Sequence, residues 1–158
     1  MQSIGGSGIQ LEFPPIGCPP VPNGDAGCLA TSFGAMKRCQ VIDLLAEGVN
    51  EYILDEVKIP IYVCEWFNSR YDCGVKYFMK VALMDCKRNK IPGFKISFNG
   101  EKGDDQNEWD KFEYTFRDYP SGVRYIQFKD YGKDTKYWEG FYGAKLAGAT
   151  VRFLLESM

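Results

Sequence analysis

Short runs in which large apolar residues alternate with polar ones constrain this chain most, because a repeat of two residues is that of a β-strand. Residues 112–117 place three aromatic rings at every second position. We expect these rings to face a core, while Glu113, Thr115 and Arg117 face solvent. Residues 77–85 place Tyr77, Met79, Val81 and Leu83 on one face, which predicts a strand with that face buried and the other only partly wet.

Further strands are expected at 40–44, 59–66, 95–99, 123–129, 142–146 and 150–155. Eight or more short strands within 158 residues favour a single all-β sandwich or barrel. Residues 49–57 have the only helical spacing and predict a short connecting helix. The proline-rich segment 13–27 predicts an extended loop, and 100–107 a solvated hairpin loop.

The chain contains no histidine, which excludes Ser-His-Asp and Cys-His catalysis as well as zinc sites that need histidine. The acidic residues Asp104, Asp105 and Glu108 lack the spacing of a calcium-binding loop. The glycine-rich residues 5–8 lack the flanking strand, helix and lysine of a phosphate-binding loop. We therefore expect a binding module that is not an enzyme and needs no metal or cofactor.

The net charge of −2 and the pI near 5.3 provide no overall basic field, so we expect neither nucleic-acid nor membrane binding driven by charge. The sequence has no apolar run of about 18 residues and begins without the apolar segment of a signal peptide. Its six cysteines show no C-x-x-C spacing. We expect reduced thiols in a cytoplasmic protein, several of them, such as Cys64 and Cys86, in place of small buried residues.

The segment 129–145 concentrates aromatic rings and glycines between two expected strands. Its five rings are Tyr131, Tyr137, Trp138, Phe141 and Tyr142. Adjacent rings at a strand end point to opposite sides, so at least one of Tyr137 and Trp138 should face outward or line a groove. An indole suits the apolar face of a sugar ring, and a phenol or carboxylate can hydrogen-bond its hydroxyl and amide groups.

Three separate blocks of the sequence resemble the F-box-associated (FBA) domain family. Residues 39–48 read C-Q-V-I-D-L-L-A-E-G, and residues 66–74 read W-F-N-S-R-Y-D-C-G. The third block reads V-R-Y-I-Q-F at 123–128, G-K-D-T at 132–135 and Y-W-E-G-F-Y-G-A-K at 137–145. Their order and approximate spacing agree with the family from residue 5 to residue 153.

This resemblance implies an antiparallel, ten-stranded jelly-roll β-sandwich of the galactose-binding-domain type with one short helix. It also implies a single domain over 1–158, without the family's first strand and without the F-box through which such proteins join SCF ubiquitin ligases. Family members act as substrate receptors in these ligases. Some of them bind the inner chitobiose of N-glycans on misfolded glycoproteins, which links them to ER-associated degradation, and others bind no sugar.

The resemblance also suggests a ligand site. It assigns sugar contacts to Tyr137, Trp138 and Asp72, with Tyr71 beside them, and aligns Phe33 with a family aromatic near the same end of the sandwich. At least one sugar-binding member has lysine where this chain has Glu139, which replaces a donor by an acceptor. Two hypotheses therefore stand: a domain that binds the chitobiose core of N-glycoproteins, and an interaction module that binds a polypeptide client without sugar.

Overall fold

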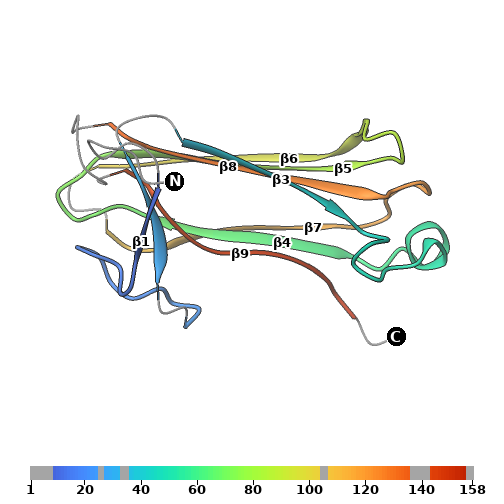
Figure 1. Cartoon of the computed structure of the whole chain (residues 1–158), viewed down its shortest axis with the longest axis horizontal. Helices are drawn as coiled ribbons and strands as arrows, with labels where there is room; N and C mark the ends of the chain where they lie inside the picture. Colours follow the sequence, from blue (N-terminus) through green and yellow to red (C-terminus); the bar gives the residue numbers. More distant parts are fainter. Residues whose placement is uncertain (1–8, 25–26, 33–35, 104–106, 136–142, 156–158) are drawn as a thin grey trace.

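The computed structural model describes residues 9–24, 27–32, 36–103, 107–135 and 143–155. Within them the chain forms nine strands and one short π-helix (Figure 1). In chain order these are β1 (Ile9–Glu12), β2 (Cys28–Thr31), β3 (Met36–Asp43), η1 (Ile53–Val57), β4 (Ile61–Asn68), β5 (Val75–Met84), β6 (Lys90–Lys102), β7 (Asp110–Phe116), β8 (Tyr125–Asp134) and β9 (Lys145–Phe153).

The strands form two sheets that pack face to face as a sandwich (Figure 1). One sheet has the order β1-β2-β9-β4-β7, the other the order β3-β8-β5-β6, and every pairing is antiparallel. The expected all-β antiparallel sandwich is therefore confirmed. Nine strands lie in the described residues, whereas the resemblance implied ten.

The core lies between the sheets and is rich in aromatic rings. Tyr77 and Met79 of β5 are buried, as their alternation predicted. The Tyr77 ring stacks on Phe67 of β4 with centroids 4.5 Å apart, and Phe67 stacks on Phe112 of β7 at 5.4 Å. Gly100 of β6 makes room for this stack, because a β-carbon there would lie 2.4 Å from Cζ of Phe67.

Several expected boundaries differ from the structure. The segments expected as two strands at 142–146 and 150–155 contribute to one strand, β9, which continues through Gly148 with φ +64°. β8 extends to Asp134, so Tyr131 lies in a strand and not in a loop. The expected hairpin loop at 100–107 starts later, since β6 ends at Lys102.

Two side-chain expectations also need correction. Tyr114 is 42% exposed although it was expected to face the core, because β7 is an edge strand and leaves the ring at the rim of the sandwich. Cys86 was expected to replace a small buried residue but is exposed in the β5–β6 turn. Cys64 is buried as expected, and all six cysteines are free thiols.

Each connection between consecutive long strands lies at one of the two ends of the sandwich (Figure 1). We call the end that holds the strand ends Thr31, Asn68, Lys102 and Asp134 the apical end. The connections β3–β4, β5–β6 and β7–β8 begin and finish at the opposite end. No helix in the described part of the chain is long and apolar enough to cross a membrane.

Candidate functional site

The residues expected to bind a ligand all belong to connections that leave strands at the apical end. Phe33 lies between β2 and β3, and Tyr137, Trp138 and Glu139 lie between β8 and β9; these four residues are outside the described part of the chain. Tyr71 and Asp72, in the β4–β5 connection, are described. The expected site can therefore be examined through its borders and through these two residues.

Backbone hydrogen bonds tie the borders of the three connections together. The bonds run from Thr135 N–H to Gly74 O (2.7 Å), from Asp134 N–H to Ser32 O (3.0 Å) and from Gly143 N–H to Thr31 O (2.9 Å). Glycine permits two of these approaches. A β-carbon at Gly74 would lie 2.5 Å from Thr135 Oγ1, and one at Gly143 would lie 2.4 Å from Thr31 Oγ1. The connections that carry the expected residues therefore start side by side.

The β4–β5 connection presents a phenol and a carboxylate. Tyr71 is 52% exposed, and its backbone N–H donates to Gly17 O at 3.0 Å, which anchors the loop to the proline-rich N-terminal segment. Asp72 forms an ion pair with Arg70, whose Nε lies 3.1 Å from Oδ1 of Asp72. The Arg70 guanidinium also lies 5.8 Å from the centre of the Tyr71 ring.

Arg70 is the residue that the sequence-based site lacked. It contacts both expected residues of this connection, so it positions the carboxylate and the ring relative to each other. The signal was present in the W-F-N-S-R-Y-D-C-G block, where an arginine and an aspartate two residues apart follow an aromatic pair.

The neighbouring thiol does not offer a nucleophile. Cys73 is buried and its Sγ donates to Asp72 Oδ1 at 3.3 Å. Burial, together with the hydrogen bond to Asp72, raises the pKa of Cys73 to about 12, so the thiol stays protonated at neutral pH. The described residues include no group of histidine, cysteine, aspartate or glutamate side chains arranged to hold a metal ion. The described side chains of this connection form an ion pair, a thiol hydrogen bond and a ring contact.

A second polar cluster lies between the sheets, and its residues Arg38 and Glu65 help to line a hollow of about 240 Å³ beside β2 and β9. Tyr77 OH donates to Glu65 Oε1 at 2.6 Å, and Arg38 Nε donates to Asp130 Oδ1 at 2.9 Å. Burial, reinforced by the charge of Asp130, raises the pKa of Glu65 well above its ordinary value. Because Arg38 also bonds Glu65 at 3.4 Å, the cluster links the two sheets.

The chain is similar in sequence to known F-box proteins. The family model described as "F-box associated region" matches residues 4–153. F-box only protein 6 of Rattus norvegicus is 37% identical over 122 residues, covering 77% of this chain and 43% of that protein. F-box only protein 17 of Homo sapiens is 32% identical over 149 residues, covering 94% and 52%. The chain thus spans about half the length of these curated relatives.

Among solved structures, the fold resembles TmCBM61 in complex with beta-1,4-galactotriose. The TM-score is 0.56 at 11% identity, and the similarity covers 92% of this chain and 82% of that one. At this identity the similarity concerns the fold alone.

Proposed function

This chain belongs to the F-box associated family, and from this premise we propose that it is a non-enzymatic recognition domain that binds the chitobiose core of N-glycans at its apical end. In a longer protein it would select N-glycoproteins or other misfolded clients in the cytoplasm for an SCF ubiquitin ligase, joined through an F-box outside this chain. The names of the relatives, F-box only proteins, support this setting.

The observation that carries the proposal is the set of backbone hydrogen bonds at the bases of the apical connections. Because they join the described borders of these connections, they support the proposal that Phe33, Asp72 and Trp138 contribute to one site. In this arrangement Trp138 stacks on an N-acetylglucosamine face, while Tyr137 and Asp72 hydrogen-bond its hydroxyl and amide groups. Ring stacking contributes about 1–3 kcal/mol per contact in base recognition, so we expect micromolar affinity at best after the cost of immobilising the sugar.

The experiment is an NMR titration of the chain with chitobiose. We expect saturable shifts in the wild type and their loss in Trp138→Ala, with the remaining spectrum unchanged. Tyr52→Ala is the matched control, since this ring is 67% exposed and precedes η1 at the opposite end. An unchanged wild-type spectrum at millimolar chitobiose would exclude the proposal.

Asp72→Asn tests the carboxylate separately. This substitution keeps the size of the side chain but removes the charge that pairs with Arg70, and a hydrogen bond to a charged group contributes about 1.5–3 kcal/mol. We expect chitobiose binding at least about tenfold weaker. Asp118→Asn, in the β7–β8 connection, should bind as the wild type does, because Asp118 is exposed at the other end and asparagine tolerates its φ of 53°.

A second candidate function, polypeptide recognition, is favoured by the exposed Tyr71 with Arg70 against its ring. Tyrosine and arginine are enriched at the centres of protein interfaces, and Glu139 adds an acceptor. The two candidate functions can be distinguished by measuring binding of a glycoprotein before and after its N-glycans are removed. Loss of binding supports the sugar. Retained binding that Tyr71→Ala abolishes supports the polypeptide.

A further inference from the structure

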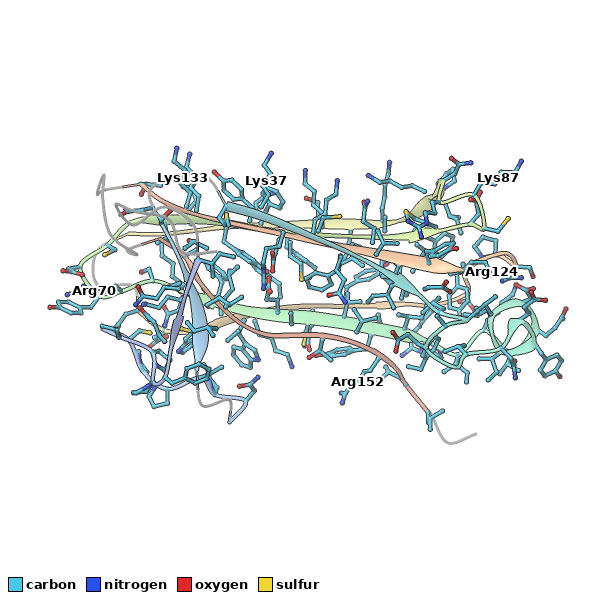
Figure 2. All side chains as sticks on the ribbon, viewed as in Figure 1. Lys37, Arg70, Lys87, Arg124, Lys133 and Arg152 are labelled. Carbon is cyan, nitrogen blue, oxygen red and sulfur yellow. The ribbon has the colours of Figure 1, made fainter. Side chains whose placement is uncertain are left out.

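The outer face of the β3-β8-β5-β6 sheet is rich in lysine. Strand alternation and register bring seven lysines to this face: Lys37, Lys76, Lys80, Lys90, Lys95, Lys129 and Lys133. Figure 2 labels Lys37 and Lys133 on the side away from the other sheet. Two carboxylates share the face, Asp43 and Glu101. The chain's net charge of −2 therefore conceals a basic surface.

Two pairs of lysines stand directly opposite each other on neighbouring strands. The register pairs Lys80 with Lys129 and Lys76 with Lys133. Like charges in directly opposed positions destabilise a sheet. Lys76 has one distant ion pair, to Glu101 at 3.9 Å, whereas Lys80 and Lys129 have none with any residue that the structure describes. A bound anion would offset this repulsion.

A hollow of about 490 Å³ lies in the middle of the basic face. Its floor includes Ala82, whose methyl group leaves space among longer side chains. Four lysines line the hollow, Lys80, Lys90, Lys95 and Lys129, together with Ser97 and Gln127. The volume falls within the range of small-molecule sites, and the hydroxyl and amide can donate hydrogen bonds to an anion.

We propose that this hollow binds a ligand carrying several phosphate groups, either free in solution or as a lipid headgroup. Lysine binds phosphate as a point charge, so four lysines around one hollow match a ligand with several phosphate groups better than a ligand with a single negative charge. The site is separate from the apical connections and does not depend on sugar binding.

The aromatic rings on the same face argue against single-stranded nucleic acid as the occupant. Phe78 and Tyr131 stack on each other with centroids 4.8 Å apart and planes 3° apart, and Lys80 lies 4.9 Å from the Phe78 ring centre. Sheets that bind single strands stack bases on free ring faces. In this structure Phe78 and Tyr131 each use one ring face to stack on the other. Recognition of charge in the hollow is therefore favoured over stacking of bases on these rings.

The first test is calorimetric titration of the whole chain with inositol hexakisphosphate. We expect saturable binding that weakens as salt increases. Ser97 stands opposite Lys80 in the register, so Ser97→Glu places a carboxylate among the lysines. It should weaken binding at least about tenfold and raise the melting temperature by relieving repulsion. Arg152→Gln changes the charge equally on β9 of the other sheet (Figure 2) and should leave binding unchanged.

Lys80→Gln combined with Lys129→Gln provides a second variant at surface positions, and it should also lose affinity while folding normally. Sedimentation with phosphatidylcholine vesicles, with and without phosphatidylinositol 4,5-bisphosphate, separates the sources. Binding to the bisphosphate vesicles that Ser97→Glu abolishes assigns a lipid headgroup, and binding of the soluble probe alone assigns a free ligand. The proposal is wrong if neither probe binds, if Arg152→Gln weakens binding as much as Ser97→Glu, or if polyglutamate binds more tightly than both probes.

Discussion

At the scale of single residues, the carboxyl group of Glu65 is fully buried, and its burial raises its pKa. The hydrogen bond from Tyr77 OH lowers the pKa of Glu65, because this bond favours the ionised carboxylate. A group whose pKa is raised on folding loses stabilisation as pH rises from its unfolded value of about 4.5 through its folded value. The Tyr77 hydroxyl limits that loss.

Tyr77→Phe should therefore destabilise the fold in a pH-dependent way. Without the hydroxyl the pKa of Glu65 rises further, so we expect the loss of unfolding free energy to increase as the pH rises from 4.5 and Glu65 ionises, up to about 1.5–3 kcal/mol. Urea denaturation of both proteins across this pH range measures the difference.

Tyr119→Phe is the matched control, since Tyr119 is also buried but its hydroxyl donates to a neutral acceptor, Ile59 O, at 2.7 Å. Its loss should be about 1 kcal/mol at every pH tested. If the two variants show the same pH profile, the Tyr77 hydroxyl does not stabilise an ionised Glu65.

The sequence predicts which face of its strand a residue such as Tyr77 occupies, but it does not predict the hydrogen-bond partner of that residue. The alternation over 77–85 placed Tyr77 in the core correctly. Its partner Glu65 lies on β4 of the opposite sheet, and no local periodicity specifies contacts between sheets. The same limit applies to the lysine pairs, because Lys80 and Lys129 become neighbours only through the β5–β8 register.

At the scale of elements, alternation located most strands and failed at their boundaries. β1 and β2 have four residues each, too few to show a repeat, and both were missed. Residues 147–149, which read A-G-A, were left as a break between two expected strands. In the structure Gly148 adopts φ +64° beside a register shift between β4 and β9, and the strand continues.

The short helix η1 depends on an ion pair that extends to the β7–β8 connection. Asp55 accepts from Arg124 Nη2 at 2.8 Å and from Gly122 N–H at 2.7 Å. These bonds, that from Arg124 foremost, lower the pKa of Asp55 to about 2, from an ordinary 3.8. The stabilisation is therefore present above pH 3.8 and is lost as pH falls toward 2.

Asp55→Asn should lower the unfolding free energy by about 1–2 kcal/mol at pH 7, after allowance for solvent screening of a partly exposed pair. The difference from the wild type should shrink between pH 4 and pH 2 as Asp55 becomes protonated. Thermal or urea unfolding followed over that range measures it. A difference that stays constant down to pH 2 would show that the charge of Asp55 has no role.

At the scale of the whole molecule, topology determines which distant segments meet, and the sequence reveals this only through family resemblance. The three motif blocks indicated connections at one end of a sandwich, and the hydrogen bonds among Ser32, Gly74, Asp134 and Thr135 support their proximity. The specific contacts of Phe33, Tyr137, Trp138 and Glu139 remain predictions. The net charge of −2 does not describe how charge is distributed, because a sum over the chain cannot show a surface on which like charges gather.

The two ends of the chain are joined by a buried ion pair between Glu12 of β1 and Lys145 of β9. Their side chains are 4% and 1% exposed. Glu12 also accepts from Ile16 N–H at 3.0 Å, so one carboxylate connects the N-terminal segment to the last strand. Removing one partner of a buried pair leaves the other charge uncompensated, which costs about 3–5 kcal/mol.

Glu12→Gln should therefore destabilise the whole sandwich by about 3–5 kcal/mol in urea denaturation. The double variant Glu12→Gln with Lys145→Met should recover most of that loss, because an apolar side chain of similar length removes the stranded charge. Glu101→Gln, which breaks the exposed pair with Lys76, should change stability by less than about 1 kcal/mol. If the double variant is as unstable as Glu12→Gln alone, the packing of Glu12, and not its charge, joins the first strand to the last.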